Sequence, residues 1–192
     1  DAMKNFLNSF EIKSLLYAKE KEQKDTALYY TVKTPVFPTE DKEKLDISYF
    51  DYYQAGDDGE EEDEPFVRGV YKNKVVANDT TGEKIFISFF KAPRYEYEED
   101  SVKFNNNNSK VSIFGDTSWI VRYKNTYQLP NKMQVYEAIV SDTGSSRTLW
   151  TKTFYKDGIN YSLFTQGDTL TKPSDFVRSF FDSFAPADTL QG

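Results

Sequence analysis

The chain has 192 residues, a formal net charge of −7, no cysteine and no histidine. This length suits one ordinary domain, and because 17% of the residues are aromatic, we expect Phe and Tyr to fill much of its core. The lack of His and Cys excludes Ser-His and Cys-His nucleophilic sites, disulfides and the usual zinc ligands. An acidic balance without a basic stripe argues against nucleic acid as a partner.

The sequence also bounds the cellular setting. No apolar run approaches the ~18 residues that a membrane-spanning helix needs, so we expect no membrane span in this segment. No signal peptide is visible, and the chain starts at Asp1 rather than Met. We therefore expect a segment of a longer protein. The lack of cysteine, together with this truncated start, leads us to expect a location outside the cytoplasm, in the periplasm or at the cell surface.

The two ends of the chain resemble each other. Residues 1–10 read DAMKNFLNSF, and residues 175–184, which lie 174 positions later, read DFVRSFFDSF. Both segments space their apolar residues as one face of a helix. The second predicted helix follows an N-cap at Ser174 and stops before Pro186.

This similarity leads to an interpretation of the domain organisation. Residues 1–12 would be a helix that echoes the end of a preceding repeat, and residues 13–192 would form a single domain. The chain would then be one repeat of about 174 residues in a tandem array. The alternative is a chance similarity between two amphipathic helices.

Between the two ends the pattern predicts mostly strands. Residues 11–24 fit a short charged helix or a helical extension. Alternating or continuous apolar residues then predict strands over 28–33, 45–53, 66–71, 74–77, 85–90, 118–123, 133–140, 149–155 and 159–165. We predict tight hairpins at Lys72-Asn73 and at Asp157-Gly158, and the last three strands form a predicted meander.

An acidic stretch, Gly56–Glu64, has seven acidic residues in nine positions. Its carboxylates could bind a hard cation such as Ca²⁺. The spacing lacks the alternating Asp-x-Asp-x-Asp-Gly order of an EF-hand, so we favour a solvated loop and assign no metal or other cofactor. The weak candidate ligands are Asp57, Asp58, Glu60, Glu61 and Asp63.

The stretch SDTGSSRTLW, residues 141–150, contains an Asp-Thr-Gly-Ser run after an apolar segment, as in the catalytic loop of aspartic proteases. Those enzymes need two aspartates that share a proton. Asp116-Thr117-Ser118 and Asp168-Thr169-Leu170 are poor second copies of the run, because neither has Gly after the Thr. Because Asp, Thr, Gly and Ser are also turn residues, we favour a hairpin loop over a catalytic role for Asp142.

The C-terminal part resembles a known family. The hairpin YKDGINYSL, residues 155–163, and the helix ending FFDSF, residues 180–184, resemble the closing portion of PsbP-like domains. The resemblance covers about the last 40 residues. It implies an α/β/α sandwich around an antiparallel sheet, in domains that are generally non-catalytic binding or assembly modules. It carries no catalytic residue onto this chain.

A second resemblance concerns residues 119–158 and the ending Pro186-Ala187-Asp188-Thr189. These are similar to repeated segments that follow TraB/GumN-type domains in some Bacteroidetes proteins. This resemblance implies that any hydrolase chemistry lies in an upstream domain.

These observations predict an α+β fold, a mainly antiparallel sheet flanked by helices, built as a PsbP-like α/β/α sandwich with strand 85–90 at its centre. We expect a non-enzymatic binding or assembly module, one repeat of a larger extracytoplasmic protein, whose partner is another protein or a neighbouring repeat. The alternative is a carboxylate-dependent hydrolase that uses Asp142.

Overall fold

The computed structural model describes residues 19–37, 46–51, 68–92, 119–170 and 172–187. The predicted helix within 1–12 and the acidic stretch 56–64 lie outside these residues. The elements are β1 (Lys21–Asp25), β2 (Tyr30–Thr34), β3 (Asp46–Asp51), β4 (Arg68–Ala77), β5 (Lys84–Lys91), β6 (Trp119–Gln128), β7 (Gln134–Asp142), β8 (Arg147–Lys156), β9 (Ile159–Asp168), α3 (Asp175–Ser183) and β10 (Ala185–Pro186).

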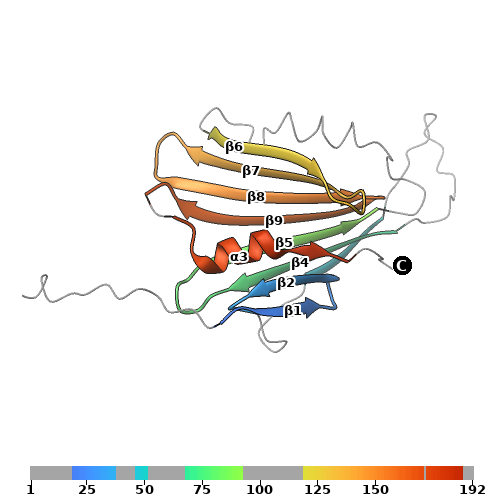
Figure 1. The fold of residues 1–192 in the computed structure, drawn as a ribbon. Helices are drawn as coiled ribbons and strands as arrows, with labels where there is room; N and C mark the ends of the chain where they lie inside the picture. Colours follow the sequence, from blue (N-terminus) through green and yellow to red (C-terminus); the bar gives the residue numbers. More distant parts are fainter. Residues whose placement is uncertain (1–18, 38–45, 52–67, 93–118, 171, 188–192) are drawn as a thin grey trace, which may run out of the picture.

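The strands form two antiparallel sheets. A seven-stranded sheet has the order β3-β4-β5-β9-β8-β7-β6, and a three-stranded sheet has the order β1-β2-β10. Side chains from β2, α3 and the large sheet share one buried cluster, so the small sheet and α3 cover the same face of the large sheet. Figure 1 shows α3 running along the lower half of the large sheet, next to β2, with β1 on the far side of β2.

The predicted α+β sandwich is wrong. The described residues contain one α-helix, and the fold is rich in antiparallel β-structure. Helices were expected to cover the large sheet, but the small sheet forms part of that covering layer. Residues 21–24 belong to the segment 11–24 that was predicted to be helical, but with Asp25 they pair with β2 as strand β1. Their charged sequence has little local preference, so pairing with a distant strand decides their conformation.

The predicted hairpin at Lys72-Asn73 is also wrong, because both residues lie inside the continuous strand β4. From Val70 to Ala77 this strand pairs with β5 residue by residue. The chain reverses after Ala77 instead, where Asn78 Oδ1 accepts a hydrogen bond from the Thr80 amide (3.1 Å) and Gly82 takes a φ of 74°. The polar residues Lys72 and Asn73 are therefore paired strand residues of β4 and do not form a turn.

Other local predictions are confirmed. Asp157 and Gly158 have φ angles of 48° and 76°, so both central residues of the β8–β9 hairpin are left-handed, as a tight type I′ turn requires. Strands β7, β8 and β9 form the predicted meander. Strand β5, predicted at the centre of the sheet, is an interior strand, but the middle strand is β9. Only one face of β5 is fully buried, since Phe86 is 40% exposed.

The terminal helix matches its prediction closely. Ser174 is the N-cap, and its Oγ accepts a hydrogen bond from the Val177 amide (3.2 Å). The helix ends at Ser183, and Phe184 is extended. The predicted apolar face is buried, and it comprises Phe176, Val177, Phe180, Phe181 and, just after the helix, Phe184.

The core that these residues enter is aromatic, as the composition predicts. Phe184 lies at its centre, with its ring centroid 4.6 Å from that of Tyr30, 5.3 Å from Phe154 and 5.8 Å from Tyr161. These partners come from β2, β8 and β9, so one side chain joins both sheets. Such aromatic pairs stabilise a core beyond the area that they bury.

We predict that Phe180→Ala lowers the free energy of unfolding by ~3–5 kcal/mol, because it leaves a cavity between α3 and the sheets. Urea unfolding would measure the change. Arg178→Ala is the matched control on the same helix, since its ion pair with Asp175 is exposed and worth at most ~1 kcal/mol. Equal losses in the two variants would contradict the role of α3 as a core element.

Candidate functional site

The residue that the sequence singles out, Asp142, ends strand β7 and opens the turn to β8. Its Oδ1 accepts a hydrogen bond from the Gly144 amide (2.8 Å), and its Oδ2 accepts from Ser145 Oγ (3.0 Å). Arg147 Nη2 lies 3.1 Å from the same Oδ2 and completes an ion pair. The predicted hairpin loop is therefore confirmed, and the Asp-Thr-Gly-Ser run is the chemistry of that turn.

These contacts set the charge state of Asp142. The Gly144 amide and the Ser145 hydroxyl hold the pKa of Asp142 below its ordinary value, and Arg147 contributes in the same direction. Each donor favours the ionised carboxylate. A general acid needs the opposite shift, toward a pKa nearer neutrality.

A second aspartate lies in the same cross-strand row of the sheet. Trp119 is opposite Asp142, and Arg147 is opposite Asp168. The Arg147 guanidinium lies 4.9 Å from the Trp119 ring centre. Arg147 belongs to strand β8, which lies between the strands of Asp142 and Asp168, so an arginine stands where a proton-sharing dyad would need direct contact.

The Asp168 carboxylate also accepts hydrogen bonds from nearby loop residues. One of its oxygens accepts a hydrogen bond from Ser146 Oγ (2.9 Å), and the other accepts from the Leu170 amide (2.6 Å). Both carboxylates therefore serve the loops at this end of the sheet. The other predicted site residues, Asp57, Asp58, Glu60, Glu61 and Asp63, lie outside the described residues. Within the described ranges, no group of three or more Asp and Glu side chains is arranged to hold a metal ion.

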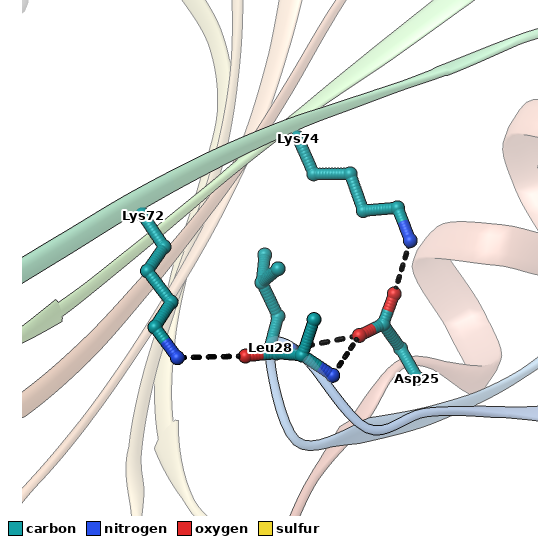
Figure 2. Close-up of polar contacts among 5 residues, drawn as sticks. Asp25, Leu28, Lys72 and Lys74 are labelled. Carbon is teal, nitrogen blue, oxygen red and sulfur yellow. Dashed lines mark hydrogen bonds and ion pairs between the residues drawn. The ribbon is translucent and has the colours of Figure 1, made fainter. Parts of the chain in front are cut away.

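The sequence analysis missed the buried charges of this protein. In the part of the chain that the structure describes, three charged side chains are buried: Asp25, Lys74 and Lys152. Asp25 Oδ1 accepts hydrogen bonds from the amides of Ala27 (2.8 Å) and Leu28 (2.7 Å), and Oδ2 pairs with Lys74 Nζ. Figure 2 shows Lys74 reaching from β4 to the turn between β1 and β2.

Two further side chains of the large sheet hold the same turn. Lys72 Nζ donates to the Ala27 carbonyl oxygen (3.0 Å), and Figure 2 shows this lysine reaching the turn from β4. The same Nζ lies 5.1 Å from the ring centre of Tyr29. The Tyr161 hydroxyl, from β9, donates to the Leu28 carbonyl oxygen (2.6 Å). The turn thus has its backbone polar groups satisfied by β4 and β9, which a turn packed against a sheet requires.

Lys152 makes the corresponding contact with α3. Its Nζ donates to the Phe181 carbonyl oxygen (2.9 Å) in the last turn of the helix, where carbonyl groups lack helical partners. The same Nζ pairs with Glu137 (2.8 Å), which also accepts from the Tyr127 hydroxyl (2.8 Å). Burial, and then this bond to Glu137, raises the pKa of Tyr127.

The buried tyrosines beside Asp25 are held in their neutral form. Burial is the main cause that raises the pKa of Tyr30, and the negative charge of Asp25 adds to it. The same two causes raise the pKa of Tyr161. Among the described residues the Tyr30 hydroxyl has no hydrogen-bond partner. A phenol whose ionisation is suppressed in this way is a poor general base.

A sequence signal for these contacts exists. Lys72 and Lys74 alternate with outward-facing residues and share a face with Val76, which is fully buried. A lysine at a core-facing strand position predicts a buried partner for its charge. The alternating pattern of β4 does not identify that partner, because Asp25 lies 49 residues before Lys74 in the sequence.

Comparison with known proteins assigns no family. The sequence matches no protein-family model, and no curated protein matches it. The resemblances to PsbP-like domains and to TraB/GumN-associated repeats therefore stay hypotheses. In the described ranges, no helix has the length and apolar character that crossing a membrane requires.

We predict that Lys74→Met lowers the free energy of unfolding by ~3–5 kcal/mol, because the Asp25 carboxylate stays buried without this counter-charge. Adding Asp25→Asn should recover part of the loss, since the charge itself is then removed. Urea unfolding in a double-mutant cycle would measure the coupling. Lys84→Met, on the exposed side of β5, is the control and should change stability by no more than about 0.5 kcal/mol.

We also predict that Asp142 titrates below its ordinary pKa of 3.8. A lowered folded-state pKa means that the stabilisation from Asp142 is present at neutral pH and is lost as the pH falls through the folded pKa. Carboxyl chemical shifts would report the titration. Ser145→Ala should raise the pKa of Asp142, whereas Ser146→Ala, whose hydroxyl bonds Asp168, should leave it unchanged; a pKa at or above 3.8 in the native chain would contradict the turn contacts.

Proposed function

We propose that this protein is a non-enzymatic module that binds a partner protein or a neighbouring repeat within a larger extracytoplasmic protein. One observation carries the proposal: each buried charged side chain of the described part is engaged in holding one layer of the fold to another. Asp25 and Lys74 join the small sheet to the large one, and Lys152 joins α3 to β8.

The alternative, a hydrolase based on Asp142, receives no support from the geometry of the loop. Its carboxylate is committed to an amide, a hydroxyl and a guanidinium, and its pKa is lowered. Acid–base chemistry by carboxylates needs two groups whose environments push their pKa values apart, with one kept protonated. Asp168, the other carboxylate in the row, is engaged by Ser146 and Leu170.

The resemblance to PsbP-like domains supports the same proposal for the closing part of the chain. The hairpin 155–163 and the segment 180–184, which carry that resemblance, contribute Tyr161 and Phe184 to one aromatic contact. The resemblance to repeats that follow TraB/GumN-type domains adds the setting, in which a catalytic domain and this module are separate parts of one protein.

A hydrolysis assay tests the proposal. We expect the chain to cleave an unfolded protein such as denatured casein no faster than buffer does between pH 3 and pH 7, and no faster than the Asp142→Asn variant. Cleavage by the native chain that pepstatin blocks and Asp142→Asn abolishes would overturn the non-enzymatic assignment and restore the hydrolase.

A further inference from the structure

Strand β6 forms one border of the seven-stranded sheet, and among the described strands it pairs only with β7. It is ten residues long, and every residue from Ile120 to Thr126 is exposed. Figure 1 shows it at the upper border of the large sheet, on the side away from the small sheet. A long edge strand offers its outward backbone N–H and C=O groups to another chain.

Two apolar rows of side chains run across the sheet and end on β6. They comprise Leu149, Val140 and Val121 on one face, and Trp150, Ile139 and Tyr123 on the other. In the first row Leu149 and Val140 are buried, whereas Val121 is 51% exposed. Tyr123, which ends the second row, is 45% exposed. One further strand beside β6 would therefore continue both rows and bury the side chains at their ends.

Exposed apolar side chains are concentrated on this strand. Seven large apolar side chains are exposed in the described part of the chain, and three of them, Ile120, Val121 and Tyr123, lie within one turn-free stretch of β6. Single exposed apolar residues need no explanation, but a group of them on a strand edge marks an interaction site.

The charges of this border have one sign. Residues 119–133, which include β6 and the turn after it, contain Arg122, Lys124 and Lys132 and no Asp or Glu, in a chain whose net charge is −7. All three cations are exposed, and within the described residues none of them pairs with a carboxylate. Both acidic residues of β7 already pair with cations of β8. The border therefore presents positive charge that its surroundings do not neutralise.

We propose that β6 is a docking edge for an extended acidic segment of a partner protein, which adds one more strand to the large sheet. Backbone hydrogen bonds to β6 hold the segment, its apolar side chains cover Val121 and Tyr123, and its carboxylates meet Arg122 and Lys124. The inference rests on the binding function proposed above, and it names the site and the chemistry of the partner.

A β-bulge places the two cations on different faces of the edge. The register of β6 against β7 shifts at Arg122, which is the extra residue of the bulge, and its Nε donates to Ser141 Oγ (2.6 Å). Lys124 lies opposite Ala138, and since Ala138 and Ser141 are three residues apart on β7, they face opposite sides of the sheet. A matching segment therefore carries carboxylates on both of its faces.

The same cations disfavour a second copy of this chain as the occupant. Arg122 and Lys124 lie near the middle of β6, and the strand has no carboxylate. Two β6 strands paired about a two-fold axis would bring the cations of both copies together, and like charges on neighbouring strands are destabilising. The edge is therefore unfavourable for its own copy and favourable for a strand of opposite charge.

Peptide titration of the full chain tests the proposal. The acidic probe has ten residues, with glutamate at every third position and valine or threonine between, so that carboxylates lie on both faces of the strand. A basic probe has lysine in place of each glutamate. A third probe keeps the glutamates but has proline at two central positions, which prevents strand pairing.

We expect the acidic probe to change the amide chemical shifts of β6 and to slow the hydrogen exchange of its amides. Its affinity should exceed that of the basic probe and of the proline probe by at least about tenfold, because only the acidic probe combines opposite charge with strand pairing. Added salt should weaken its binding, since the charges involved are exposed.

Two charge-reversal variants separate the site from the overall charge. Lys124→Glu should weaken the acidic probe roughly tenfold and strengthen the basic one. Lys84→Glu makes the same change in net charge on β5, four strand spacings or about 19 Å from β6, and should leave the affinity within about twofold. Both lysines are exposed, and thermal unfolding of each variant checks that the fold is retained.

Three results would overturn the proposal. The first is an acidic probe that leaves the β6 amides unchanged. The second is equal affinity for the acidic probe and either of the other two, because strand pairing or charge would then play no part. The third is a dimer of the native chain in which the β6 amides are protected without peptide, because a second copy would then occupy the edge. Each leaves the non-enzymatic assignment intact, since that assignment depends on the hydrolysis assay.

Discussion

The fold depends on the buried ion pair between Asp25 and Lys74. The small sheet is short and its first strand is charged, so its apolar contact with the large sheet comes from β2 and the turn before it, through Leu28, Tyr30 and Val32. The carboxylate of Asp25 shapes its own turn through two backbone amides and meets a lysine from β4. A buried pair of this kind adds little stability over an apolar contact, but it penalises every register that leaves one charge alone.

The position of the β1–β2 turn also determines where Tyr30 enters the aromatic core. Strand β2 carries Tyr30 into contact with Phe184, which also meets side chains of β8 and β9. Lys152 holds the end of α3 in the same way that Lys72 and Lys74 hold the turn. Three inward-facing lysines thus connect the apolar face of the large sheet to the layer above it, which leaves these groups little capacity for chemistry.

The contacts of Asp142 also bear on function. Asp142 has the local sequence of a protease loop and the local contacts of a hairpin, because the residues that suit one suit the other. The closing segment of α3 and β10 is joined to β2 through a serine, two backbone pairs and an aromatic side chain.

The sequence by itself determined the features whose causes are local. These are the capped helix after Ser174, the Asp-Gly hairpin, the turn at Asp142 and the aromatic nature of the core. Only the tertiary structure decided that residues 21–25 form a strand, that β4 runs unbroken through Lys72 and Asn73, and that a sheet covers part of a face where helices were expected. Each of these depends on a partner far away in sequence, such as Asp25 for Lys74, and no local pattern records which distant residue will satisfy a buried charge or a strand edge.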